Sequence, residues 1–437
     1  MKTEVILRMT GNQQLILRDH LFPGDGNEAV ALALCGRRIG DSRQPLMIYK
    51  IVPITHSECF ERRPGFLHWP TERVIPLVEE ARKQKMAILK IHSHPGWYRN
   101  FSLLDDKSDR DLFSSIHGWV DDNQPHASAI MLPDGSIFGR AIFSDGELVP
   151  LSSVSVAGDS LDFWQRGEGS SATCEPGLKR NAQTFGEKTF QILRGLSIAV
   201  VGCSGTGSLV AEQLARLGVG GITLVDPDRA GVENLNRIPN SFLHHAKNGT
   251  FKVELLRAAI EEMGLGTKVS TFASSLFNPG VVAAVAQSDI VFGCMDTVDG
   301  RNLLNNIAVF YSIPYFDLGV RLDADGEGGV SLVCGTVHYL QPDGSSLLSR
   351  GVYTPDDIRT ASLKRTNPEE YDSEIKSNYI RGIPGDRPAV ISVNMQIASL
   401  AVNEMLARLH PFRNVSNAQY AVHGMNLTEA TLFSPAS

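Results

Sequence analysis

The sequence predicts an α/β protein with two domains: a mixed α/β domain followed by a Rossmann-like, doubly wound domain. The chain has 437 residues, more than one hydrophobic core usually supports. A segment rich in Gly and Ser, Gly158 to Gly177, lacks sustained periodicity, and beyond it strand-like and helical runs alternate, which indicates a parallel sheet. We therefore expect a first domain over residues 1–155, a linker over 156–177 and a second domain over 178–437.

The composition is typical of a soluble protein that does not bind nucleic acid. Hydrophobic residues make up 42% of the chain and charged residues 20%, so each half can bury a core. The formal net charge is −7 and there is no long basic run, which excludes an electrostatic footprint for nucleic acid. Charges near the N-terminus argue against a signal peptide, and the apolar runs are too short to span a bilayer. We expect a cytoplasmic protein whose partners are proteins or nucleotides.

Periodicity gives the expected elements of each domain. In the first domain we expect apolar segments, an amphipathic helix and a short buried strand, over Ala29 to Cys35, Leu46 to Ile54, Arg73 to Lys85 and Ala87 to Ile91. In the second domain strands and helices should alternate over Ser197 to Val201, Ser208 to Leu217, Ile222 to Val225 and Asp289 to Phe292. The six cysteines contain no Cys-x-x-Cys pair, so a zinc site, if there is one, must use histidine.

A candidate metal site follows the buried strand of the first domain. The segment from His92 to Asp105 reads HSHPGWYRNFSLLD. His92, His94 and Asp105 would give zinc three protein ligands and leave its fourth position to water, as in catalytic sites. Alternate residues of a strand share one face, so both imidazoles can reach one metal. A lone His-x-His is most often unrelated to metal, but Ser102 and Asp105 at fixed offsets favour a metal site.

This segment resembles the fingerprint of the JAMM/MPN+ (JAB) zinc metalloprotease family, His-x-His-Pro-x6-Ser-x2-Asp with a distant upstream glutamate, over about residues 1–150. The resemblance implies a JAMM/MPN mixed α/β domain with (iso)peptidase activity, in which Glu28 is the general base and Ser102 stabilises the oxyanion. The chemistry agrees, because zinc lowers the pKa of bound water to about 7 and a carboxylate can accept its proton. Glu58 and Glu61 are alternatives to Glu28, since a different fold could bring either one to the site.

The second domain begins with a candidate nucleotide loop. Residues 196–208 read LSIAVVGCSGTGS, a strand followed by a turn that contains Gly202, Gly205 and Gly207. Glycines let the backbone approach phosphates, and a helix N-terminus favours an anion. The next strand ends at Asp226, where a carboxylate would meet a ribose hydroxyl. This context predicts a nucleotide without choosing between NAD and ATP.

Polar residues further along the chain favour ATP. They are Asn234, Arg237, Lys252 and Asp296. Hydride transfer needs no convergent arginine, lysine and metal-binding aspartate, whereas nucleotidyl transfer needs cations to neutralise charge on the α-phosphate. We interpret Asp299 and Arg301 as solvated surface charges, and Cys203 and Cys294 as structural.

Residues 178–412 closely resemble the ThiF/MoeB/HesA family of ubiquitin-activating adenylyltransferases. The resemblance implies that Asp226 binds ribose, that Asn234, Arg237 and Lys252 contact phosphates, and that Asp296 holds Mg²⁺. In KRNAQTFG, Arg180 matches an arginine that the family lends to the ATP of the partner subunit, which implies a homodimer. The late segment AVISVNMQIASLAVNEML also matches the family and can equally be a packed amphipathic helix.

One segment departs from this family. Where the resemblance leads us to expect Cys-Leu-x-Cys, the sequence PDGSSLLSRGV carries Ser346 and Ser349. A serine is not ionised at neutral pH as a cysteine thiolate can be, which argues against a thioester at this loop. The serines are either natural or engineered to trap an intermediate, and the sequence does not distinguish the two.

Together the two halves predict a chain that uses Zn²⁺, ATP and Mg²⁺ to process and activate a ubiquitin-like protein with a C-terminal glycine tail. The first half would trim a precursor tail or cut isopeptide conjugates, and the second would adenylate the exposed carboxylate. Such a fusion resembles bacterial ubiquitin-like modification modules, some tied to antiviral defence, and sulfur-carrier systems, so a conjugating enzyme or a sulfur donor is a further expected partner. Two alternatives remain: an NAD-dependent oxidoreductase, and a JAMM half that only docks the modifier.

Overall fold

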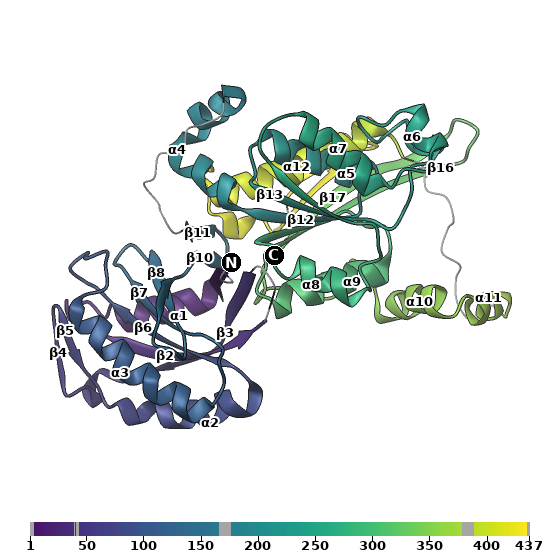
Figure 1. The fold of residues 1–437 in the computed structure, drawn as a ribbon. Helices are drawn as coiled ribbons and strands as arrows, with labels where there is room; N and C mark the ends of the chain where they lie inside the picture. Colours follow the sequence, from purple (N-terminus) through teal and green to yellow (C-terminus); the bar gives the residue numbers. More distant parts are fainter. Residues whose placement is uncertain (1–3, 39, 41–42, 166–175, 378–388, 435–437) are drawn as a thin grey trace. The chain divides into compact units, whose positions relative to one another are not determined.

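The computed structural model describes residues 4–38, 40, 43–165, 176–377 and 389–434. The chain forms two compact units, Met1–Ser170 and Ser171–Ser437 (Figure 1). Among the described helices, none combines the length and apolar character that crossing a bilayer requires.

The N-terminal unit is built on a nine-stranded mixed sheet in the order β11-β10-β1-β3-β2-β6-β7-β8-β9. Its strands are β1 (Glu4–Thr10), β2 (Val30–Arg37), β3 (Arg43–Pro53), β6 (Ala87–Ser93), β7 (His126–Met131), β8 (Ile137–Ile142), β9 (Leu148–Pro150), β10 (Ser153–Ala157) and β11 (Leu161–Gln165). Its helices are α1 (Gly11–Leu21), α2 (Ile75–Gln84) and α3 (Leu103–Val120). A separate hairpin joins β4 (Glu61–Arg63) to β5 (Phe66–His68).

Helices cover both faces of this sheet. Along β2, Ala31 and Ala33 belong to the core that includes residues of α1, whereas Val30 and Leu32 belong to the core that includes residues of α2 and α3. This alternation follows from the two-residue period of a strand. The chain therefore buries β2 on both sides, which explains why its sequence is apolar throughout.

Strand β6 carries the first candidate zinc ligand to the face covered by α3. Ile88 belongs to the core beneath α2 and α3, and Lys90 and His92 share its face because they follow at two-residue steps. The strand continues to Ser93, two residues beyond the predicted Ile91, so His92 lies inside the strand rather than after it.

The structure corrects the expected linker. Residues 156–177 were expected to be irregular, yet β10 and β11 form an antiparallel pair at the edge of the N-terminal sheet. Leu161 and Phe163 are buried there. The prediction was wrong for residues 161–165 because this short apolar alternation is masked by its Gly- and Ser-rich surroundings. Residues 166–175 of the predicted linker lie outside the described residues.

The C-terminal unit contains an eight-stranded sheet in the order β14-β13-β12-β15-β16-β17-β18-β19. Its strands are β12 (Ser197–Val201), β13 (Gly221–Val225), β14 (Lys268–Phe272), β15 (Ile290–Gly293), β16 (Tyr315–Ala324), β17 (Val330–Leu340), β18 (Val422–Asn426) and β19 (Thr431–Phe433). Its helices are α4 (Lys179–Gly195), α5 (Gly205–Arg216), α6 (Leu243–Lys247), α7 (Lys252–Glu262), α8 (Pro279–Val285), α9 (Val298–Phe310), α10 (Pro355–Thr366), α11 (Pro368–Lys376) and α12 (Ile391–Leu409).

The sheet of this unit is mixed, and only its first part is doubly wound. Strands β14, β13, β12, β15 and β16 are parallel, whereas β17, β18 and β19 are added antiparallel. The short connection between β16 and β17 explains the change, because parallel neighbours need a long crossover. Helices α5, α7 and α12 lie on one face and α8 and α9 on the other (Figure 1). The chain runs outward from β12 in both directions, so the carboxyl ends of β12 and β15 form the switch point where such sheets bind ligands.

Two residues interpreted as solvated charges are in fact paired and largely buried. Asp299 is 6% exposed and its Oδ2 accepts from Arg365 Nε at 2.7 Å. The Arg301 guanidinium forms a two-pronged pair with the fully buried Asp317, with Nε to Oδ1 at 2.9 Å. The interpretation was wrong because each partner comes from a distant element that local sequence does not reveal.

Candidate functional site

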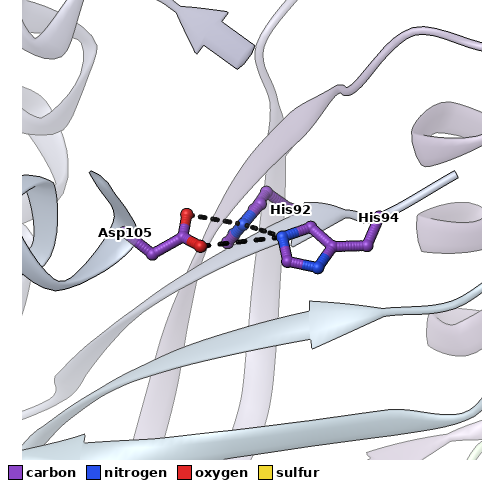
Figure 2. Close-up of side chains that lie close together, drawn as sticks. All are labelled: His92, His94 and Asp105. Carbon is purple, nitrogen blue, oxygen red and sulfur yellow. Dashed lines mark hydrogen bonds and ion pairs between the residues drawn. The ribbon is translucent and has the colours of Figure 1, made fainter. Parts of the chain in front are cut away.

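The structure brings His92, His94 and Asp105 together where β6 ends and α3 begins (Figure 2). The two Nε2 atoms are 3.2 Å apart, and Asp105 Oδ1 lies 3.1 Å from His92 Nε2. Two tetrahedral Zn–N bonds of about 2.0–2.1 Å would hold their nitrogen atoms about 3.3 Å apart. The donor types and their spacing therefore fit a zinc ion.

Burial and a backbone contact set which nitrogen atoms of the two imidazoles carry hydrogen. His94 Nδ1 lies 2.8 Å from the carbonyl oxygen of Tyr98. Since a carbonyl can only accept, Nδ1 carries the hydrogen and Nε2 presents its lone pair to the cluster. His92 is 3% exposed, and burial lowers its pKa, which favours the neutral form that metals bind.

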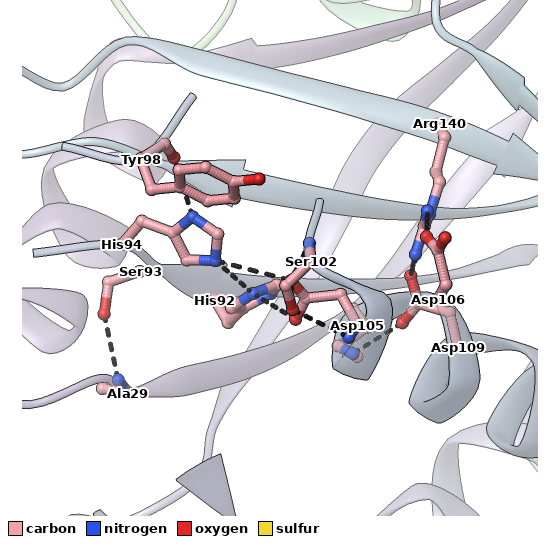
Figure 3. Close-up of polar contacts among 11 residues, drawn as sticks. Ala29, His92, Ser93, His94, Tyr98, Ser102, Asp105, Asp106, Asp109 and Arg140 are labelled. Carbon is pink, nitrogen blue, oxygen red and sulfur yellow. Dashed lines mark hydrogen bonds and ion pairs between the residues drawn. The ribbon is translucent and has the colours of Figure 1, made fainter. Parts of the chain in front are cut away.

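Ser102 fixes the carboxylate of the cluster (Figure 3). It is the N-cap of α3, and its hydroxyl accepts the Asp105 N–H at 3.1 Å and donates to Asp105 Oδ2 at 2.7 Å. Burial alone would raise the pKa of Asp105, but hydrogen bonds from His92 and Ser102 hold that pKa well below its usual range. The carboxylate thus stays ionised. The Ser102 hydrogen points to Asp105 in this arrangement, so an oxyanion role would require it to turn away.

Glu28 lies beside the cluster in a cavity of about 230 Å³ that His92, His94, Ser102 and Asp105 also line. Its side chain is largely buried, and burial, reinforced by the negative charge of Asp105, raises the pKa of Glu28 to about 7. A carboxyl group with a pKa near neutrality can both accept and release a proton. The arrangement suits a general base.

The two alternative glutamates lie elsewhere in the N-terminal unit. Glu58 accepts the backbone N–H of Thr55 at 3.2 Å, and Glu61 pairs with Arg63 at 3.0 Å. Neither is among the described residues that line the cavity. The structure therefore favours Glu28 over both.

The β4–β5 hairpin also contacts Glu28. Arg62 Nε donates to the Glu28 carbonyl oxygen at 2.9 Å, and the Gly65 backbone N–H donates to the Glu28 carboxylate. Sequence reasoning missed both contacts. The sequence alone does not show where the backbone N–H of Gly65 will lie, and nothing in the sequence distinguishes Arg62 from the other arginines.

A second group of potential ligands lies at the far end of α3: His117, Asp122 and His126. The Ile88 N–H donates to His126 Nδ1 at 2.9 Å, so the hydrogen of this imidazole must sit on Nε2. Nδ1 therefore cannot bind a metal without losing its contact with the Ile88 N–H, and Nε2 carries the hydrogen. The carboxylate of Asp122 is already paired with Arg37 at 2.7 Å. We therefore interpret this group as structural.

In the C-terminal unit, Asp226 links the glycine loop to Lys252. Its Oδ2 accepts the Cys203 N–H at 2.7 Å, and its Oδ1 lies 3.9 Å from Lys252 Nζ. Lys252 also pairs with Asp228 at 2.8 Å. Burial raises the pKa of Asp226, and the lysine charge opposes that rise. A carboxylate is thus placed at the carboxyl end of β13, next to a cation and to the loop that follows β12.

The glycine loop is too closely surrounded for side chains. A Cβ at Gly207 would lie 1.7 Å from the Gly202 carbonyl oxygen, and one at Gly205 would lie 2.2 Å from Asn394 Nδ2 and 3.1 Å from Arg237 Cδ. Arg237 and Asn394 therefore flank the loop. Sequence reasoning missed Asn394, because the segment around it was matched to the family and to a packed amphipathic helix without a role for any single residue.

The remaining predicted residues occupy different positions. Asn234 is buried, and its Oδ1 accepts the Gly231 N–H at 3.0 Å. Asp296 is exposed just after β15. Two residues earlier in the chain, the Cys294 carbonyl oxygen would lie 2.7 Å from a Cβ atom placed on Gly202, so this end of β15 borders the glycine loop. Arg180 is an exposed residue of α4. Burial raises the thiol pKa of both Cys203 and Cys294, which fits structural roles.

The loop that carries Ser346 and Ser349 is closed by the two serines. The Ser346 N–H donates to Ser349 Oγ at 2.9 Å and the Ser349 N–H donates to Ser346 Oγ at 3.0 Å. Leu347 between them is fully buried. Each hydroxyl thus caps the backbone of the other residue.

Comparison with known proteins matches the C-terminal unit. A family model described as "ThiF family" covers residues 178–435. Ubiquitin-like modifier-activating enzyme 5 of Culex quinquefasciatus is 28% identical over 168 residues, 36% of this chain and 39% of that protein. Adenylyltransferase and sulfurtransferase UBA4 of Meyerozyma guilliermondii is 32% identical over 145 residues, 33% of each protein. Molybdopterin-synthase adenylyltransferase of Haemophilus influenzae is 29% identical over 139 residues, 32% of this chain and 56% of that protein. The chain thus spans about a third to just over half the length of these relatives.

Proposed function

The chain belongs to the ThiF family, and from this premise we propose that residues 178–437 use ATP and Mg²⁺ to adenylate the C-terminal carboxylate of a ubiquitin-like protein. The observation that carries this proposal is the convergence of the glycine loop, Asp226, Lys252 and Arg237 at the switch point of the sheet. The names of the relatives support an activating or adenylyltransferase role.

In the proposed reaction, a carboxylate oxygen of the modifier forms a bond to the α-phosphorus of ATP. The bond from that phosphorus to the bridging oxygen breaks, and pyrophosphate leaves. Asp226 would bind the ribose hydroxyls, and the loop N–H groups at the start of α5 would face the phosphates. Arg237 and Lys252 would neutralise charge that develops on the phosphates, with Asn234 in a supporting contact and Asp296 holding Mg²⁺.

We also propose that the protein is a homodimer in which Arg180 of one subunit reaches the ATP of the other. The exposed position of Arg180 on α4 supports this role, because an arginine that serves a second copy must be accessible. A cytoplasmic location and a place in an antiviral modification system or a sulfur-carrier system are part of the same proposal.

For the N-terminal unit we propose a zinc-dependent peptidase that acts on the tail of the same modifier. His92, His94 and Asp105 would hold the metal, whose contribution is to polarise a carbonyl and lower the pKa of water. Glu28 would accept a proton from the attacking water and pass it to the leaving nitrogen as the C–N bond breaks. Ser102 would hold Asp105 and, when its hydrogen turns, donate to the oxyanion.

The two activities would act in sequence, since cleavage exposes the carboxylate that adenylation needs. The test uses a β-grasp modifier that carries a C-terminal extension beyond its glycines. We expect the full chain to cleave the extension and then to exchange labelled pyrophosphate into ATP. Exchange only with a pre-trimmed modifier, and no cleavage, would leave the N-terminal unit as a docking module. A rise of melting temperature with NAD but not with ATP would overturn the activating function in favour of an oxidoreductase.

A further inference from the structure

A buried ion pair lies next to the candidate zinc ligands. Lys90 Nζ is 2.5 Å from Asp109 Oδ1, and the two side chains are only 5% and 0% exposed. Lys90 precedes His92 by two residues on β6, and Asp109 follows Asp105 by one turn on α3, so each charged residue shares a face with a ligand. The Lys90–Asp109 and His92–Asp105 contacts thus connect the same two elements side by side.

The ion pair is anchored further by β8 (Figure 3). Asp109 Oδ2 accepts from Arg140 Nη2 at 2.7 Å and from its Nε at 3.1 Å. The same guanidinium pairs with Asp106 and lies 3.7 Å from the centre of the Phe101 ring. The network therefore ties α3 to both β6 and β8.

The proposed zinc ligands need this support because the segment that connects β6 to α3 does not fix their relative positions. Residues 94–102 connect β6 to α3 and contain no helix or strand, so they do not fix the distance between the two elements. An apolar pair of similar volume would often stabilise the fold as well as a buried ion pair does. An ion pair with defined hydrogen-bond geometry adds a fixed distance and direction, which apolar contacts do not.

We propose that Lys90 and Asp109 are positioning residues that hold β6 and α3 at the separation the zinc ligands require. This inference rests on the proposed zinc site. Lys90 would act on the metal indirectly, by fixing the positions of His92 and Asp105. Lys90 also borders the cavity.

The test measures zinc affinity of the full chain by competition with a chromophoric chelator, together with the visible absorption spectrum of the cobalt-loaded protein. We expect Lys90→Met to weaken zinc binding about 10–100-fold, as changes next to metal ligands typically do, and to alter the cobalt spectrum. Lys90→Arg should restore much of both. The matched control is Lys50→Met, which removes an exposed lysine paired with Glu80 at 3.0 Å in the same unit and should change neither.

A second variant separates positioning from folding. Lys90→Met/Asp109→Leu replaces the pair by apolar groups and leaves Arg140 paired with Asp106, so the metal-free protein should stay folded while zinc affinity remains low. Wild-type zinc affinity and a wild-type cobalt spectrum in either folded variant would overturn the inference, whatever happens to cleavage. Absence of zinc binding by the wild-type chain would be a different result, because it removes the proposed peptidase itself.

Discussion

Ser102 and Asp105 hold each other in place: the Ser102 hydroxyl donates to Asp105 Oδ2 over 2.7 Å, and the Asp105 N–H donates back to that hydroxyl over 3.1 Å. Ser102 therefore accepts a backbone N–H at the N-terminus of α3 and also orients the carboxylate that faces His92. The Ser102 N–H also donates to Asp105 Oδ2 at 2.7 Å, so formation of the helix and alignment of this carboxylate depend on the same residue.

Zinc content is the first prediction. His94→Ala removes one of the three proposed zinc ligands, and we expect zinc to fall from one per chain to nearly none by elemental analysis. ATP–pyrophosphate exchange with a trimmed modifier should persist, because the residues proposed to bind ATP lie in the other unit. His68→Ala serves as the control, since this exposed residue of β5 is not among those that line the cavity. Undiminished zinc in the His94 variant would exclude the site.

The second prediction concerns Glu28. Glu28→Gln keeps the shape of the side chain and all three ligands but cannot accept a proton. Zinc content should stay normal while cleavage falls by about 10²–10⁴-fold, the range typical of a lost general base. Glu61→Gln, which changes an exposed glutamate of the β4–β5 hairpin, should cleave normally. Near-full cleavage by the Glu28 variant would move the base to another group.

The third prediction concerns magnesium and the dimer. Asp296→Ala should abolish magnesium-dependent pyrophosphate exchange, because loss of the ion removes several kcal/mol of transition-state stabilisation. Asp323→Ala, in the exposed β16–β17 hairpin, should have no effect.

Mixing Arg180→Ala with Asp296→Ala chains tests the dimer. Half of the composite sites in a mixed dimer would carry neither lesion, so activity should partly return. No recovery after proven subunit exchange would remove Arg180 from the site.

The fourth prediction separates two glycines of the glycine loop. Gly207→Ala would place a methyl group 1.7 Å from backbone oxygen, so the loop must distort and exchange activity should be lost. Gly205→Ala meets the Asn394 side chain instead, so exchange should fall and then recover partly in Gly205→Ala/Asn394→Ala. The exchange rates of the single and double variants give the coupling energy between positions 205 and 394. Strictly additive losses would show that Asn394 does not limit the space at Gly205.

The fifth prediction is a pH dependence of stability. His338 is 7% exposed on β17, and burial lowers its pKa to about 4. The pKa of an unfolded histidine is about 6.5, so the unfolded chain binds the proton first as the pH falls. The C-terminal unit should therefore lose up to about 3 kcal/mol from this residue between pH 6.5 and 4.

His338→Gln cannot titrate and should flatten the corresponding slope of the unfolding free energy against pH, measured by denaturant unfolding. His244→Gln, an exposed histidine, should keep the wild-type slope. Equal slopes for wild type and His338→Gln would contradict the prediction.

Local spacing accounts for what the sequence could predict. His92, His94, Ser102 and Asp105 lie within one short segment, and the glycine turn directly follows its strand, so residue type and offset suffice to group them. Contacts between distant segments could not be predicted from the sequence. The partner of Lys90 lies on α3, and Asn394 reaches Gly205 from α12. Strand β11 was missed for a different reason, because its apolar residues are few and lie in a Gly- and Ser-rich context.

The serine-closed loop has a consequence for redox chemistry. Hydroxyl groups do not form disulfides or sulfenic acids, so oxidants that modify thiolates cannot open the turn between Ser346 and Ser349. Cys203 and Cys294, beside the glycine loop, are protected in another way, because their raised thiol pKa keeps them protonated. At these four positions the C-terminal unit offers no thiolate for an oxidant to modify.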